Sequence, residues 1–274
     1  MTRYDILAHV RHYEGNSLAA DVALALAARL DAHVSGLYVA SLGTVAYSTL
    51  ETVVFQVQEA DELYDAASAQ RDAWSRRLAA ARVEGEWLVA QGEPVEAICH
   101  AARWCDLVVA ERPQLNADAP IGWGIVSRTV FGAGAPVVVV PETAKTTDVG
   151  ERIAVAWNHS REAARAIHGA LPLLRQAKQV LVLDGAEQTS LVGARHLPAF
   201  DLPAYLKRHG VTAEFRPFNV ASGYGAAILD AAHAAQSDLI VMGAWGHSRI
   251  AELVLGGATR HLFQHSDVPL FVAH

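Results

Sequence analysis

Short apolar runs recur along this chain, and most of them lack the alternation of apolar and polar residues that marks a half-buried strand. Examples are DLVVA, PVVVVP, RIAVAW, QVLVLD and DLIVM. Continuous runs of β-branched and aliphatic residues are typical of strands covered on both faces, and such strands usually belong to parallel sheets. Because helical stretches separate the runs, the pattern predicts doubly wound α/β layers.

The order of these segments occurs twice. YDILAHV near the N-terminus and ERIAVAW in the middle of the chain each lead into an alanine-rich helical stretch, and Asp106 then corresponds to Asp238. Self-similarity on this scale indicates two related domains. The polar stretch PETAKTTDVGER between them has the composition of a linker. We therefore predict two tandem α/β domains, 1–145 and 146–274, each with about five strands.

The first half also contains an insert, from Leu42 to about Arg82, that has no equal in the second half. From Leu50 onward this insert has a strongly helical pattern. The matching region of the second half is shorter and is broken by Pro198 and Pro203.

The composition of the chain excludes several classes of function. The chain has 274 residues with 52% apolar and 19% charged residues and a net charge of −7, so we expect little disorder and no nucleic-acid partner. Cys99 and Cys105 form no metal-ligand pattern, and we expect reduced thiols. We find no signal peptide and no apolar run of membrane-spanning length, which favours a cytoplasmic protein with no membrane contact.

Glycines cluster after the last apolar run but one. Gly243 and Gly246 follow DLIVM, and nine residues later Gly256 and Gly257 precede a short predicted helix, about 258–264. Open α/β sheets bind ligands beyond the carboxyl ends of their strands, and main-chain amides at a helix N-terminus favour phosphate. The two glycine groups are therefore candidates for opposite sides of one anion pocket. Alternatively, the first pair makes a strand-to-loop turn and Gly256 ends a preceding helix.

This spaced glycine motif, with SDVPLFV after it, resembles that of the universal stress protein family. The resemblance covers the whole chain as two tandem units and is strongest in the second. It implies a five-stranded parallel sheet with helices on both faces. It also implies an adenine nucleotide, ATP with or without Mg²⁺, as the cofactor, and a role in the stress response.

The resemblance also assigns site residues. Gly243, Gly246 and Gly256 match the phosphate-loop glycines of the family, and Thr259 matches a common hydroxyl residue. Gly257 stands where the family usually has Ser or Thr, which keeps the amide donor and loses a hydroxyl.

Asn158 follows the first strand of the second half, where the family usually has an Asp that helps to fix the nucleoside. Asn158 or Ser160 is alternatively the N-cap of the next helix. His247 and Arg249 lie between the glycine groups, and Arg260 lies just after them. These three side chains either contact phosphate or ribose or are solvated.

The first half departs from the motif. Glu111, Arg112, Pro113 and Gln114 stand where the first glycine pair is expected. Long side chains would fill a phosphate site there, and Glu111 would repel phosphate. We therefore expect this half to bind no nucleotide and to pack against the second half as a dimer partner would.

No catalytic motif is found. GHSRI lacks the last glycine of a nucleophile elbow, and the P-loop and HExxH motifs are missing from the sequence. His261 and His265 have a metal-chelating spacing, but no third ligand is near in sequence, so we expect surface histidines.

Three hypotheses follow. The first is an ATP-binding regulatory module, and the second is a scaffold of the same fold that binds no nucleotide and acts through dimerisation or protein contacts. The third is an enzyme of slow nucleotide hydrolysis. From the resemblance we also expect a homodimer and a protein partner that the sequence does not identify.

Overall fold

The structure is a computed structural model that describes residues 4–15, 17–41, 50–113, 124–185, 200–218, 220–244 and 257–274. By its internal contacts the chain divides into two compact units, unit 1 (Met1–Thr147) and unit 2 (Asp148–His274). The domain boundary that we placed after residue 145 lies two residues before this division. In the described part of the chain, no helix is both long and apolar enough to cross a membrane.

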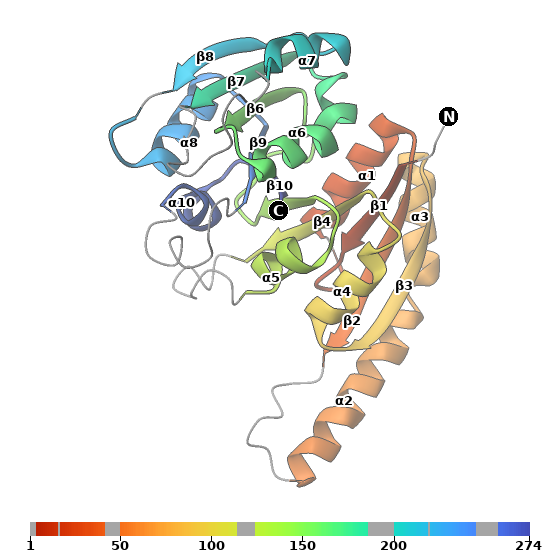
Figure 1. The fold of residues 1–274 in the computed structure, drawn as a ribbon. Helices are drawn as coiled ribbons and strands as arrows, with labels where there is room; N and C mark the ends of the chain where they lie inside the picture. Colours follow the sequence, from red (N-terminus) through yellow and green to blue (C-terminus); the bar gives the residue numbers. More distant parts are fainter. Residues whose placement is uncertain are drawn as a thin grey trace. The chain divides into compact units, whose positions relative to one another are not determined.

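Unit 1 is a doubly wound α/β layer (Figure 1). Its elements are β1 (Tyr4–His9), α1 (Leu18–Leu30), β2 (Ala32–Ser41), α2 (Leu50–Ser68), α3 (Arg71–Ala81), β3 (Glu84–Gly92), α4 (Pro94–Ala102), β4 (Leu107–Arg112), α5 (Ile125–Gly132) and β5 (Val137–Pro141). The strands pair in the order β3-β2-β1-β4-β5, and all of these pairs are parallel. Helices α1 and α3 contact each other over one face, and α4 and α5 contact each other over the other.

Unit 2 has the same strand order, β8-β7-β6-β9-β10, again with parallel pairs only. Its elements are β6 (Arg152–Trp157), α6 (Arg161–Leu174), β7 (Gln179–Gly185), α7 (Leu202–Arg208), β8 (Glu214–Phe218), α8 (Tyr224–Ala234), β9 (Leu239–Gly243), α10 (Gly257–His265) and β10 (Leu270–Ala273). The predicted α/β fold with five-stranded parallel sheets is therefore confirmed.

The strand register gives the equivalence of the two units residue by residue. Ile6 pairs with Leu107 in unit 1, and Ile153 pairs with Leu239 in unit 2. Counting along the strands from these pairs, His9 corresponds to Ala156, Arg11 to Asn158, Glu111 to Gly243 and Asp106 to Asp238. In each unit the fourth strand lies beside the first, and the strand order reverses between them, which is where such folds bind ligands.

The predicted equivalence of Asp106 and Asp238 has a structural role. Asp106 accepts a hydrogen bond from the main-chain N–H of Asp5 at 2.9 Å. Asp238 accepts three, from the N–H groups of Gly150, Glu151 and Arg152, at 2.6 to 3.0 Å. Each carboxylate thus ties the start of the first strand to the start of the fourth.

From Leu50 onward the insert of unit 1 forms α2 and α3, as its helical pattern predicts. The two helices cover the β3 side of the sheet. Trp74 of α3 packs over Gly36, where a Cβ would lie 2.6 Å from the indole ring. The ring of Trp87 on β3 lies 5.5 Å from that of Trp74, and its Nε1–H donates to the carbonyl of Ala67 in α2 at 2.8 Å.

Candidate functional site

The candidate site of unit 2 begins where β6 and β9 end. Gly243, the last residue of β9, lies against the first turn of α6: an added Cβ would collide with the main chain of Glu162 and Ala163. The missing side chain therefore lets α6 approach the strand closely. This contact by itself requires a glycine at position 243, whether or not the residue also binds a ligand.

Asn158 follows β6 directly and is exposed. Its side-chain oxygen accepts hydrogen bonds from the N–H of Ser160 at 3.2 Å and from the Ser160 hydroxyl at 2.7 Å. Ser160 in turn is the N-cap of α6 and accepts from the N–H of Ala163 at 3.1 Å. The tight turn between them places His159 at φ 59°, a region that L-residues rarely adopt.

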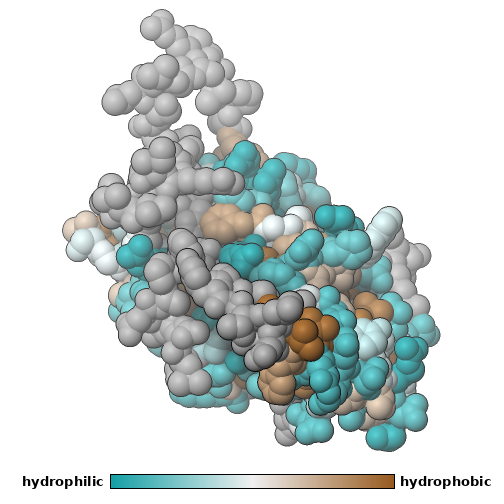
Figure 2. Space-filling model, turned by 90° about the horizontal axis from the view of Figure 1, so that it is seen from below, coloured by the Kyte–Doolittle hydropathy of each residue, from teal (hydrophilic) through white to brown (hydrophobic). Residues whose placement is uncertain are grey.

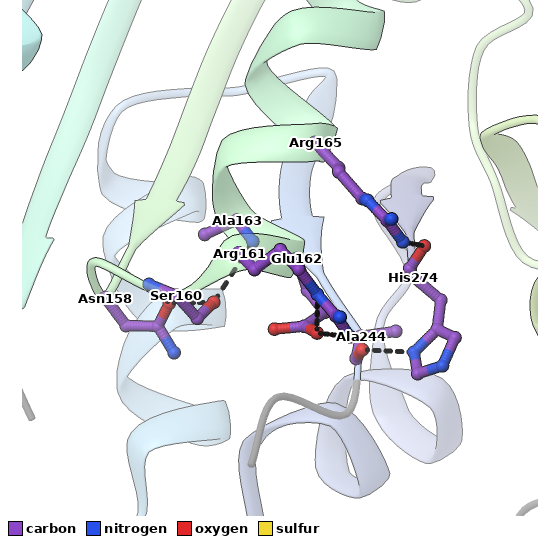
Figure 3. A network of polar contacts seen from close by, with 8 residues as sticks. All are labelled: Asn158, Ser160, Arg161, Glu162, Ala163, Arg165, Ala244 and His274. Carbon is purple, nitrogen blue, oxygen red and sulfur yellow. Dashed lines mark hydrogen bonds and ion pairs between the residues drawn. The ribbon is translucent and has the colours of Figure 1, made fainter. Parts of the chain in front are cut away.

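This network assigns the capping role to Ser160 and gives Asn158 a supporting one (Figure 3). The oxygen of Asn158 is engaged within the turn, so its amide N–H₂ is the group that it can offer to a ligand.

A buried carboxylate stands next to this turn. Glu162 lies in the first turn of α6 with its side chain 5% exposed, and its Oε1 accepts two hydrogen bonds from the guanidinium of Arg161, at 2.7 and 3.0 Å. Burial alone would raise the pKa of Glu162, but hydrogen bonds from its own main-chain N–H and from Arg161 outweigh burial and lower the pKa. Glu162 is therefore ionised at neutral pH, and Arg161 is its counter-ion.

The end of the chain anchors the residue after β9. Ala244 donates its N–H to the carbonyl of Ala273 at 2.8 Å, and its carbonyl lies 3.1 Å from Nδ1 of His274. Arg165 of α6 donates to the carbonyl of His274 at 2.8 Å. Figure 3 shows the contacts of His274 with Ala244 and with Arg165. Together with the Ala273 bond, they fix the residue that follows β9.

Helix α10 supplies the other described part of the site. Gly257 is its first residue and is exposed, and nothing in the described chain comes within 4 Å of where its Cβ would be. Thr259 is buried in the first turn, and Arg260 beside it is exposed. Gly246, His247, Arg249 and Gly256 lie outside the described residues.

The two histidines of α10 face each other, with ring centroids 4.5 Å apart. Burial and the neighbouring His265 lower the pKa of His261, and Asp230 opposes them. Among the described residues, no group of three or more His, Cys, Asp or Glu side chains could hold a metal ion.

The equivalent corner of unit 1 contains ion pairs. Arg11 donates to Glu111 at 3.3 Å and to Glu142 at 3.0 Å, and the Glu111 side chain is only 14% exposed. Glu111, which we expected to block a phosphate site, therefore pairs with Arg11, just after β1. The sequence did not predict this ion pair.

Sequence reasoning also missed Arg161 and Glu162 in unit 2. A signal was present, because an acidic residue within the first turn of a helix is favoured by the helix dipole and marks where that helix begins. The close approach of α6 to Gly243 had no sequence signal, since it joins residues about 80 positions apart.

Comparison with known proteins is consistent with this geometry. Residues 150–274 match the model of the universal stress protein family. Unit 2 therefore contains a domain of the universal stress protein family, as the glycine motif predicts. No curated protein sequence matches the chain.

Two solved structures extend the fold comparison to both units. A universal stress protein from Archaeoglobus fulgidus aligns over 98% of this chain and 95% of its own, with a TM-score of 0.72 and 17% identity. A putative universal stress protein from Pseudomonas aeruginosa aligns over 99% of this chain and 93% of its own, with a TM-score of 0.64 and 12% identity. At these identities the likeness shows the fold: two tandem units of the universal stress protein type.

Some structural neighbours bind adenine nucleotides. A family protein from Arabidopsis thaliana was solved with AMP bound. It covers 53% of this chain and 97% of its own, at a TM-score of 0.34 and 15% identity.

Proposed function

We propose that unit 2 is a nucleotide-binding module that takes an adenine nucleotide, ATP with or without Mg²⁺, at the carboxyl ends of β6 and β9. The observation that carries the proposal is Gly257, an exposed glycine that opens α10 with no described atom within 4 Å of where its Cβ would be. Free N–H groups in the first turn of a helix favour phosphate, and a glycine there lets the phosphate come close.

The glycine motif places further proposed contacts around this helix. The phosphates would rest on main-chain amides at Gly243, Gly246, Gly256 and Gly257, with Thr259, His247 and Arg249 as supporting groups. Asn158 would offer its amide N–H₂ to the nucleoside, because its oxygen is already bonded to Ser160. Arg161 would screen the phosphates from the buried charge of Glu162.

Occupancy of this site would change the loop after β9 and so the surface that a protein partner meets. By this account the protein is a regulatory binding module of the stress response. We propose no catalytic residue.

The experiment has two parts. One portion of the purified chain is denatured, and any nucleotide that it releases is identified by chromatography. The folded chain, freed of nucleotide, is titrated with ATP. We expect Gly257→Val to raise the ATP dissociation constant roughly tenfold or more, because a branched side chain would fill the space over the first turn of α10. The matched control is Gly124→Val, the N-cap of α5 in unit 1, whose Cβ position is equally open.

A scaffold that binds no nucleotide is the second candidate. It is favoured by the engaged oxygen of Asn158 and by the ionised Glu162 near the end of β9. Wild-type protein without bound nucleotide and without a thermal shift in Mg-ATP would support the scaffold and overturn the nucleotide proposal.

A further inference from the structure

Near the start of α2, three of the described side chains are large, apolar and exposed. Val54 is 60% exposed, Phe55 65% and Val57 42%, whereas farther along the helix the outward positions are mostly polar. Large apolar side chains are normally buried. The start of α2 instead extends beyond the sheet of unit 1 (Figure 1). From below, where the start of α2 points at the viewer, brown apolar side chains are bordered by teal hydrophilic ones (Figure 2).

The strand beneath α2 is an edge of the sheet. Among the strands that the structure describes, β3 pairs with β2 alone in unit 1, over nine residues and without a proline. Its middle residues Leu88, Val89 and Ala90 are all half-buried. The edge strand of unit 2, β8, is five residues long and contains Pro217, which is exposed. Short, proline-bearing edges resist pairing with another chain, and long apolar ones favour it.

The two helices over β3 carry opposite charge. Helix α2 contains Glu59, Asp61, Glu62 and Asp65 and has no Lys or Arg in its sequence. Helix α3 carries Arg71, Arg76 and Arg77 and one acidic residue, Asp72. Arg77 pairs with Asp21 at 2.7 Å, but Arg76 has no acidic partner among the described residues, and Glu59 has no basic one there.

Helices α2 and α3 lie near opposite ends of β3, on the same face of the sheet. Leu78 of α3 touches the Cβ position of Gly85, close to the start of the strand. Asp61 of α2 accepts a hydrogen bond from Gln91 at 2.7 Å, close to the end of the strand.

From these features we propose that β3 and the pair α2–α3 form a two-fold interface with a second copy of this chain. An axis through the middle of β3, near Leu88, pairs the two β3 strands antiparallel. Because α2 and α3 lie at opposite ends of the strand, the same axis lays α2 of one copy along α3 of the other. The acidic helix then faces the basic one.

This arrangement also covers the apolar start of α2. The outward side of α3 carries the exposed Ala79 and Ala80 beside Arg76, a small apolar surface with a basic border. An interface with an apolar centre and a charged border is the usual anatomy of a specific protein contact. The proposal concerns unit 1 and does not depend on nucleotide binding in unit 2.

The first test is the mass of the full chain in solution, by light scattering after gel filtration. We expect a dimer for the wild type and a monomer for Phe55→Glu, with an unchanged circular dichroism spectrum because Phe55 is exposed. The matched control is Trp104→Glu, since Trp104 is 85% exposed and lies outside α2, α3 and β3. We expect this variant to remain dimeric.

The second test reverses charges. Arg76→Glu is expected to raise the dimer dissociation constant roughly tenfold, because two acidic helices would then face each other. Adding Glu59→Arg to Arg76→Glu should restore most of the affinity. Amide hydrogen exchange in β3 should slow in the dimer relative to a diluted sample, because newly paired N–H groups are protected.

A wild-type monomer at about 100 μM, far above the dissociation constants of specific complexes, would overturn the proposal. A dimer that Phe55→Glu leaves intact would overturn it too, because the copies would then meet through another surface. A dimer in which β3 exchanges as fast as in the monomer would exclude the strand pairing.

Discussion

At the end of its first strand, unit 1 has Arg11 where unit 2 has Asn158, and at the end of its fourth strand it has Glu111 where unit 2 has Gly243. Unit 1 fills this corner with an ion-pair group of Arg11, Glu111 and Glu142. Unit 2 leaves the equivalent strand end without a side chain and turns its polar groups toward the start of α6. The same strand order thus supports a corner filled by ion pairs in one unit and a close contact between helix and strand in the other.

The largest expected effect comes from giving unit 2 the residue of unit 1. Gly243→Glu would drive a Cβ into the main chain of α6 and add a second carboxylate beside Glu162. We expect a loss of about 4 kcal/mol or more in unfolding free energy, the range of severe overpacking with a buried charge. The reciprocal Glu111→Gly should cost about 1 kcal/mol. Urea unfolding measures the stability of both variants. Similar losses would contradict the proposed difference between the two corners.

The aspartates that join the first strand to the fourth, Asp106 and Asp238, should contribute different amounts of stability in the two units. Asp238→Ala removes hydrogen bonds to three main-chain N–H groups, whereas Asp106→Ala removes one. We expect losses of about 3 kcal/mol and about 1 kcal/mol respectively, since bonds to a charged acceptor are the stronger kind. Thermal unfolding of the two variants checks the order, which equal losses would refute.

His9 gives unit 1 an acid sensitivity that Ala156 cannot give unit 2. Burial, with the nearby charge of Arg11, lowers the pKa of His9 from 6.5 to about 4. The unfolded chain binds this proton below pH 6.5 while the native chain does so only near pH 4. Stability therefore falls as the pH drops through this window, by up to about 3 kcal/mol.

His9→Gln should flatten that part of the stability curve relative to the wild type. Urea midpoints measured at pH 7, 6, 5 and 4 test this. Parallel curves for the two proteins would show that His9 does not titrate in this way.

The smallest effect is expected at the ends of the first strands. Arg11→Ala removes the guanidinium that joins Glu111 to Glu142, and we expect a loss of about 1–2 kcal/mol that high salt reduces. Asn158→Ala should cost about 1 kcal/mol or less, with little salt dependence, because it removes hydrogen bonds within a turn. If salt changed the stability loss equally in the two variants, the proposed difference between ion pairs in unit 1 and turn hydrogen bonds in unit 2 would be wrong.

Much of the fold could be predicted from sequence. Apolar runs such as the fully buried VVVV of β5 identified strands, and Ser160 was one of two candidates for the cap of α6. These signals are local, because a buried strand and a helix cap depend on neighbouring residues. The α2–α3 insert could be predicted for the same reason.

The site could be predicted only as far as local patterns reach. The glycine motif and Asn158 are local, but the partner of Glu111 is Arg11, 100 positions earlier, and the neighbour of Gly243 is α6. Such contacts are decided by which strands lie side by side, and the sequence does not state that order. The bond of the Asn158 oxygen to Ser160 is local, by contrast, and the sequence offered both residues as candidates for the cap.

The Arg11 ion-pair group has a thermodynamic consequence. A corner that carries its own counter-ions needs no ligand for its stability, whereas a corner completed by a ligand gains RT ln(1 + [L]/Kd) from that ligand. With nucleotide bound in unit 2, depletion of the cell's ATP would loosen one half of this chain and leave the other half unchanged.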